Sequence, residues 1–150
     1  MEIRKDTMTL DTGLVELDIN GVRTIKFNPS DVGFAEDLYG LASKIGAIQD
    51  AKEAEFARAE DPVAKFDISR AEDKEMRGVV DDYFGDGFCA DLFPGVRLYA
   101  LADGMTLIEN LLYGLLDKMD EDITANIARR DAKMKKYTDK YRKYSSKYHR

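Results

Sequence analysis

A chain of 150 residues with 44% hydrophobic content is long enough for one domain with its own core and too short for two. The single cysteine, Cys89, excludes an internal disulfide. The first residues show no secretory pattern and no apolar run is long enough for a bilayer span, so we expect a cytoplasmic protein.

Charge divides the chain into two parts. Residues 128–150 contain ten Lys and Arg against Asp131 and Asp139, a local net charge of +8. Because the whole chain carries −6, residues 1–127 carry −14. We therefore predict an acidic body over 1–127 and a basic tail over 128–150.

Residues 13–27 are predicted to form a β-hairpin. Two alternating runs flank Asn20-Gly21, which is the strongest short-range hairpin signal. A two-residue turn would mix apolar and polar faces, whereas a three-residue loop over 19–21 pairs Val15 with Ile25 and keeps the faces separate. Since a lone hairpin is only marginally stable, we expect its apolar face to lie on a helix or on a partner.

The first predicted helix covers about 31–59. It follows Pro29, with Ser30 or Asn28 as the expected N-cap, and it ends before Asp61-Pro62. Its apolar residues recur at spacings of three and four, as in coiled coils, which indicates packing in the core or against another subunit. The candidate protein-binding residues on this stripe are Phe34, Leu38 and Leu41.

Two further helices are predicted, over 70–84 and 106–127. A capping box from Ser69 to Glu72 introduces the second helix, and residues 86–95 form a compact turn region with room for one short helix. The third helix has the broadest apolar face, and it lacks Gly and Pro from Leu115 onward, which allows it to continue into the tail. The expected fold class is mainly α with a small N-terminal β-hairpin (α+β), a helical bundle with a long C-terminal helix.

The tail carries the most specific pattern in the chain. Apolar and aromatic residues recur at spacings of seven, three, four, three and four, and only Arg130 interrupts the heptad. We call this set the tail stripe: Ile127, Met134, Tyr137, Tyr141, Tyr144 and Tyr148. Tyrosine buries a large area at low entropic cost, so the stripe predicts a protein contact. The candidate binding residues here are Tyr137, Tyr141, Tyr144, Tyr148, Lys136, Lys140 and Arg142.

The tail has other interpretations. It is also compatible with a solvated, fraying terminus. Lysines interleaved with tyrosines suit nucleic acid, but the −14 body would repel a polyanion and no nucleic-acid-binding motif accompanies the tail. A helix that lies on a membrane surface usually carries Leu or Phe on its apolar face, where this stripe has Tyr. We therefore expect neither nucleic acid nor a membrane as the partner.

Residues suited to catalysis are few. The one histidine, His149, is penultimate and has no second shell to orient it, and Cys89 lies in an apolar context that predicts a buried thiol. The carboxylates at Asp81-Asp82 and over 117–122 are typical of solvated helix faces rather than metal sites. We therefore predict a protein that binds other proteins, with no catalytic, metal or cofactor site.

The layout of residues 15–48 resembles a known family. A hairpin that reads Val-Glu-Leu-Asp-Ile-Asn-Gly-Val-Arg-Thr-Ile-Lys-Phe leads directly into an amphipathic helix. This is similar to the tail assembly chaperones of long-tailed bacteriophages and related prophages. The resemblance implies a non-enzymatic protein that binds the tape measure protein and helps recruit tail tube subunits in the host cytoplasm. Separately, the charge split and the tail stripe lead us to expect self-association.

Two alternatives remain open at this point. A small structural or head–tail connector protein of a phage particle would stay in the virion. A nucleic-acid-binding regulator is the less favoured alternative.

Overall fold

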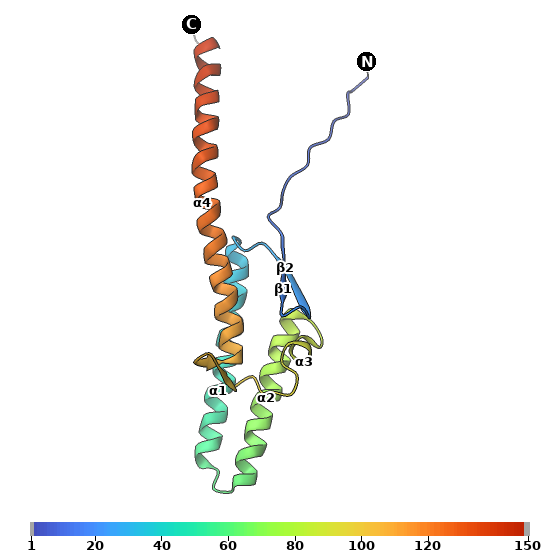
Figure 1. Ribbon diagram of the computed structural model, residues 1–150, viewed down its shortest axis with the longest axis vertical. Coiled ribbons are helices and arrows are strands. Elements are labelled where there is room, and N and C mark those ends of the chain that lie inside the picture. Colours follow the sequence, from blue (N-terminus) through green and yellow to red (C-terminus); the bar gives the residue numbers. More distant parts are fainter. Residues whose placement is uncertain (1, 149–150) are drawn as a thin grey trace.

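The structure is a computed structural model that describes residues 2–148, with side chains described up to residue 143. It is mainly helical, with an N-terminal antiparallel hairpin and a long C-terminal helix, which confirms the predicted fold class (Figure 1). Its elements are β1 (Val15–Ile19), β2 (Arg23–Phe27), α1 (Val32–Arg58), α2 (Pro62–Phe84), α3 (Phe88–Leu92), β3 (Leu101–Ala102), β4 (Met105–Thr106) and α4 (Leu107–Tyr148).

The arrangement has a packed lower part and one projecting helix. Helices α1 and α2 form an antiparallel pair joined by a short turn, and α4 runs upward beside α1 (Figure 1). The β1–β2 hairpin lies near α3 and the end of α2, while the upper part of α4 extends alone past the body. The chain before β1 also leads away from the body on that side.

One hydrophobic core joins these elements. It contains buried residues of β2, α1, α2, α3, α4 and the loop that follows α3: Ile25, Phe27, Phe34, Leu38, Leu41, Ile45, Met76, Val80, Phe88, Cys89, Leu92, Leu98, Ile108, Leu111, Leu112, Leu115 and Met119. The stacked rings of Phe27 and Phe34, 4.3 Å apart at their centroids, connect the hairpin to α1. The apolar face of the hairpin therefore lies on the helices of the same chain.

The hairpin loop has three residues, as predicted, but the predicted register was wrong by two. Leu17 pairs with Ile25 and Val15 with Phe27, so the loop covers 20–22 instead of 19–21. Asn20 and Gly21 both have positive φ, at 55° and 72°, and the Val22 amide donates to the Ile19 carbonyl at 3.2 Å. A shift of two residues preserves the faces, so the alternation alone did not distinguish the two registers.

Helix boundaries differ from the prediction at two starts. Asp31, rather than Ser30 or Asn28, caps α1, because its side chain accepts from the Gly33 amide at 2.9 Å. Helix α2 begins at Pro62, well before the predicted residue 70, with Asp61 as its N-cap. Asp61-Pro62 thus ends one helix and starts the next, since Pro suits the first helical position. The predicted capping box over 69–72 lies inside α2.

A second small hairpin, β3–β4, escaped prediction. Its turn is Asp103-Gly104, and both residues have positive φ, at 54° and 81°. Asp-Gly is a strong hairpin signal, but the flanking strands have only two residues each and carry no readable alternation. The hairpin leads into α4, where Thr106 and Glu109 exchange hydrogen bonds as a capping box.

Helix α4 is continuous from the core into the basic tail, so the tail is a helical extension of the body. Its 42 residues span about 63 Å at 1.5 Å per residue. Within the described chain, none of the helices combines the length and apolar character that a membrane crossing requires.

Candidate protein-binding surface

The stripe on α1 faces inward. Phe34, Leu38 and Leu41 all belong to the core and are almost fully covered by the hairpin, α2 and α4. In this conformation their side chains stabilise the chain itself and leave no surface for a partner. The coiled-coil spacing on α1 therefore corresponds to packing within one chain. A partner could contact these residues only if the core opened.

The described part of the tail stripe is exposed, unlike the buried stripe on α1. Ile127, Met134, Tyr137 and Tyr141 lie on the part of α4 that extends beyond the body, and all four are exposed, Tyr137 at 58% and Tyr141 at 71%. The helical geometry puts them along one side, as their spacing predicted. The side chains of Tyr144 and Tyr148 lie outside the described residues.

Cations surround the exposed aromatics. The ammonium groups of Lys136 and Lys140 lie 6.0 and 5.6 Å from the centre of the Tyr137 ring. Arg142 is exposed one turn further on. Such cation–π contacts are weak at exposed sites, so these groups remain free to pair with carboxylates of a partner. This arrangement suits a protein surface that presents both apolar and acidic side chains.

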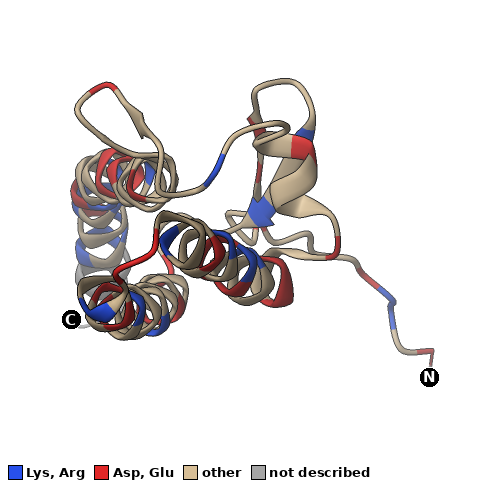
Figure 2. Cartoon of the chain, turned by 90° about the horizontal axis from the view of Figure 1, so that it is seen from below, with Lys and Arg blue, Asp and Glu red and all other residues tan. Residues whose placement is uncertain are grey.

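The charges of the body are mixed. Seen from below in Figure 2, acidic and basic residues are interspersed along the helices. In α4 itself, however, charge changes sign along the axis. Residues 117–122 contain four carboxylates and Lys118, whereas residues 129–136 contain five Lys and Arg and Asp131.

A shallow groove between α1 and α2 is a second surface feature that the sequence did not indicate. It has a volume of about 540 Å³, and Glu36, Asp37 and Asp82 line it together with exposed Tyr39. The Tyr83 hydroxyl donates to the Asp37 carboxylate at 2.9 Å. Burial, with this contact to a carboxylate, raises the pKa of Tyr83 to about 12. No sequence pattern predicts the groove, because it depends on how far apart α1 and α2 pack.

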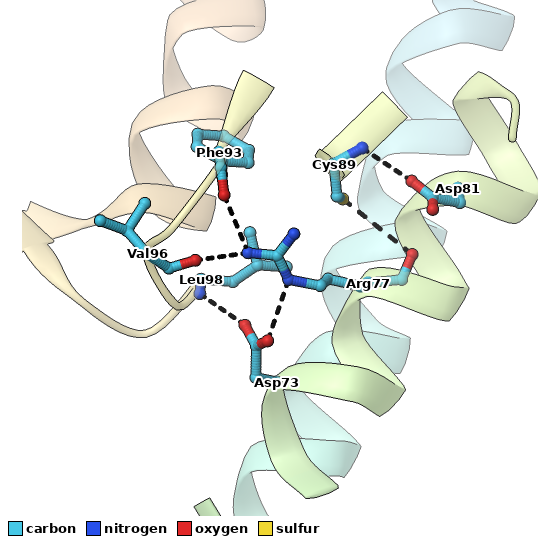
Figure 3. Close-up of polar contacts among 7 residues, drawn as sticks. All are labelled: Asp73, Arg77, Asp81, Cys89, Phe93, Val96 and Leu98. Atoms are coloured by element: carbon cyan, nitrogen blue, oxygen red, sulfur yellow. Dashed lines mark hydrogen bonds and ion pairs between the residues drawn. The ribbon is translucent and has the colours of Figure 1, made fainter. Parts of the chain in front are cut away.

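The one buried charged residue in the described chain, Asp73, is part of a structural network (Figure 3). Its carboxylate accepts from Arg77 Nε at 2.9 Å and from the Leu98 amide at 2.8 Å. Arg77 also donates to the carbonyls of Phe93 and Val96. These contacts fix the 93–98 loop on α2, and each partner is satisfied, which is typical of a structural role.

Cys89 lies beside this network and is fully buried, as the apolar context predicted. Burial, with a contribution from Asp81, raises the pKa of the thiol to about 12. The backbone amide of Cys89 donates to the Asp81 carboxylate at 2.9 Å. A neutral, covered thiol is a poor nucleophile and a poor metal ligand. Within the described residues, no three His, Cys, Asp or Glu side chains are grouped to hold a metal ion.

Comparisons of this chain with protein-family models, curated proteins and solved structures found no match.

Proposed function

We propose that this protein acts by binding other proteins through the projecting part of α4. The observation that carries the proposal is the exposure of Ile127, Met134, Tyr137 and Tyr141, on the part of α4 that extends beyond the body. Exposed large apolar and aromatic side chains in a row are costly in water unless a partner covers them. The lysine and arginine side chains around the stripe favour a partner surface that carries carboxylates.

The specific role we propose is that of a phage tail assembly chaperone, working in the host cytoplasm on the tape measure protein. Support comes from residues 15–48, where β1, β2 and α1 follow one another over the segment that resembles this family. The tape measure protein is a long helical client, and a projecting helix with an aromatic stripe can pack along it. The −14 body would keep coated client helices apart by like-charge repulsion.

The test is co-expression of the full chain with helical fragments of a tape measure protein from the same genome. We expect the fragments to stay in the cleared lysate and to co-purify with the chain. Replacing Tyr137 and Tyr141 together by serine should reduce the recovered fragment at least about tenfold, since aromatic anchors carry much of the energy of such contacts.

Tyr39→Ser is the matched control, because Tyr39 is an exposed tyrosine on the body and lies away from the tail stripe. Equal loss with Tyr39→Ser, or undiminished recovery with the double variant, would refute a binding role for the stripe. Mass spectrometry of purified particles separates a chaperone, which is absent, from a connector, which is present. A gel shift at low salt would instead identify a nucleic-acid-binding protein.

A further inference from the structure

The apolar row on α4 begins inside the body. Exposed Tyr113 and Leu116 and half-buried Ile123 continue the tail stripe toward the start of the helix at spacings of three and four. We call the full row the outer seam: Tyr113, Leu116, Asp120, Ile123, Ile127, Arg130, Met134, Tyr137 and Tyr141. It repeats every seven residues without a break, which is the pattern of a helix that packs on another helix.

Two charged residues interrupt the seam, and they have opposite signs. Asp120 and Arg130 are both exposed, and within the described side chains neither belongs to a salt bridge. They lie at equal distances before and after Ala125. When two copies of α4 are placed antiparallel about Ala125, Asp120 of each copy faces Arg130 of the other.

From Tyr113 to Tyr137, the same placement pairs every other seam residue with an apolar or aromatic one. Ile123 faces Ile127 of the second copy and Leu116 faces Met134. The outermost layer joins Tyr113 with Tyr137. Antiparallel coiled coils require a positions to face d positions, and each of these pairs meets that requirement. We propose that two copies of this chain pair through α4 as an antiparallel coiled coil centred on Ala125.

Charge selects this orientation over the parallel one. In a parallel pair, Asp120 of one copy would face Asp120 of the other, and Arg130 would face Arg130. The two basic tails would also run side by side. The antiparallel pair instead brings the acidic stretch 117–122 of one copy beside residues 128–133 of the other, which carry three cations and Asp131. Like charges placed together disfavour the parallel pair, and a charged pair within a seam fixes register and direction.

The body leaves the required flank open. The core face of α4 is formed by Ile108, Leu111, Leu112, Leu115 and Met119. On its hairpin side, Lys118, Glu121, Asp122 and Ala125 line a pocket together with residues of β1 and β2. At 3.6 residues per turn the outer seam is about 90° from the core face, on the side away from the hairpin. An antiparallel helix can therefore lie along the seam, with the two bodies at opposite ends.

Pairing through α4 does not require the proposed client. The second copy covers α4 when no client is present. Because pairing is tested on the purified chain, a negative result would not bear on client binding by the tail. The dimer covers Met134 and Tyr137 of the tail stripe and leaves Tyr141 open, so a client that packs along the whole stripe displaces the second copy.

The first experiment measures the mass of the full chain by sedimentation equilibrium. We expect twice the chain mass for the natural protein. Asp120→Arg and Arg130→Asp should each weaken the dimer about 100-fold or more, because each places two like-charged pairs in the seam. The variant with both substitutions should recover the dimer. The matched controls are Asp139→Arg and Lys135→Asp, which make the same charge changes off the seam and should leave the mass unchanged.

Mixing the two single variants gives a sharper result. Each alone is expected to be monomeric, yet together they should form a mixed dimer. The Asp120→Arg variant carries a cation at both charged seam positions and the Arg130→Asp variant carries a carboxylate at both, so opposite charges meet at both crossing points. A natural protein that stays monomeric at high concentration, or single variants as dimeric as the controls, would overturn the proposal.

Spin labels on Asp139→Cys report the direction of pairing. Buried Cys89 is protected from the label. In the antiparallel register the two labelled positions are about 42 Å apart along the axis, from the rise of 1.5 Å per residue. A separation below about 20 Å would show parallel helices and contradict the proposed register.

Discussion

The buried pair of Asp73 and Arg77 gives the most quantitative prediction. Asp73→Ala removes a carboxylate that is 6% exposed and that accepts hydrogen bonds from Arg77 and from the Leu98 amide. Breaking a buried ion pair costs about 3–5 kcal/mol. Arg77 is partly exposed and keeps the carbonyls of Phe93 and Val96, so we expect the lower end, about 3 kcal/mol.

The assay is urea unfolding of the full chain, followed by far-ultraviolet circular dichroism. At about 2 kcal/mol per molar urea, the midpoint should fall by about 1.5 M. A double-mutant cycle with Arg77→Ala should give a coupling free energy of about 2 kcal/mol, since the two residues contact each other. Asp67→Ala is the control: its partner Arg70 lies on the same helix, both side chains are well exposed, and the cost should stay below about 0.5 kcal/mol.

Either of two results would contradict this prediction. A loss for Asp73→Ala below about 1 kcal/mol would mean that the 93–98 loop does not depend on the pair. A coupling near zero would mean that Asp73 acts through the Leu98 amide alone.

Two further predictions concern ionisation and backbone geometry. Folding raises the pKa of Cys89 from 9.0, and that of Tyr83 from 10.0, to about 12 in each case. The folded chain therefore favours the protonated form of both side chains. The stability they contribute is complete below pH 9 and is lost as pH rises toward 12, which urea midpoints across that range should show. Cys89 should also resist a thiol reagent at about pH 8, near the ordinary thiol pKa, until urea is added, and rapid labelling of the folded chain would contradict its burial. Gly21→Ala should destabilise the hairpin by about 1 kcal/mol because φ is +72° there, whereas Gly78→Ala should stabilise α2 by up to about 1 kcal/mol because a Cβ meets nothing within 4 Å. Equal thermal shifts for these two glycine variants would contradict the assigned backbone.

Local patterns predicted the elements well. Asn20-Gly21 marked the first hairpin, the three-four spacing marked α1, and the lack of Gly and Pro after Leu115 allowed the long α4. The start of α2 was missed because Asp61-Pro62 was interpreted only as a stop signal. The same dipeptide serves as N-cap and first helical residue when two helices follow closely.

Long-range packing decided what the patterns left open. The spacing of Phe34, Leu38 and Leu41 is the same for a core stripe and for a partner stripe, and only the position of the hairpin, α2 and α4 shows that it is core. In the same way, Asp73 and Arg77 have the spacing of an ordinary surface pair on a helix. The network exists because the 93–98 loop folds back onto α2. By contrast, Tyr137 and Tyr141 are exposed on the outer part of α4, and their role in binding a partner stays a prediction.

Amide hydrogen exchange of the full chain, with and without a tape measure fragment, tests the central claim most directly. We predict that the fragment slows exchange in residues 134–148 of α4 and leaves α1 and α2 unchanged, because the fragment packs on the exposed stripe and the core is already covered. Slowed exchange confined to the body, or no change in the outer part of α4 at a saturating fragment concentration, would contradict it.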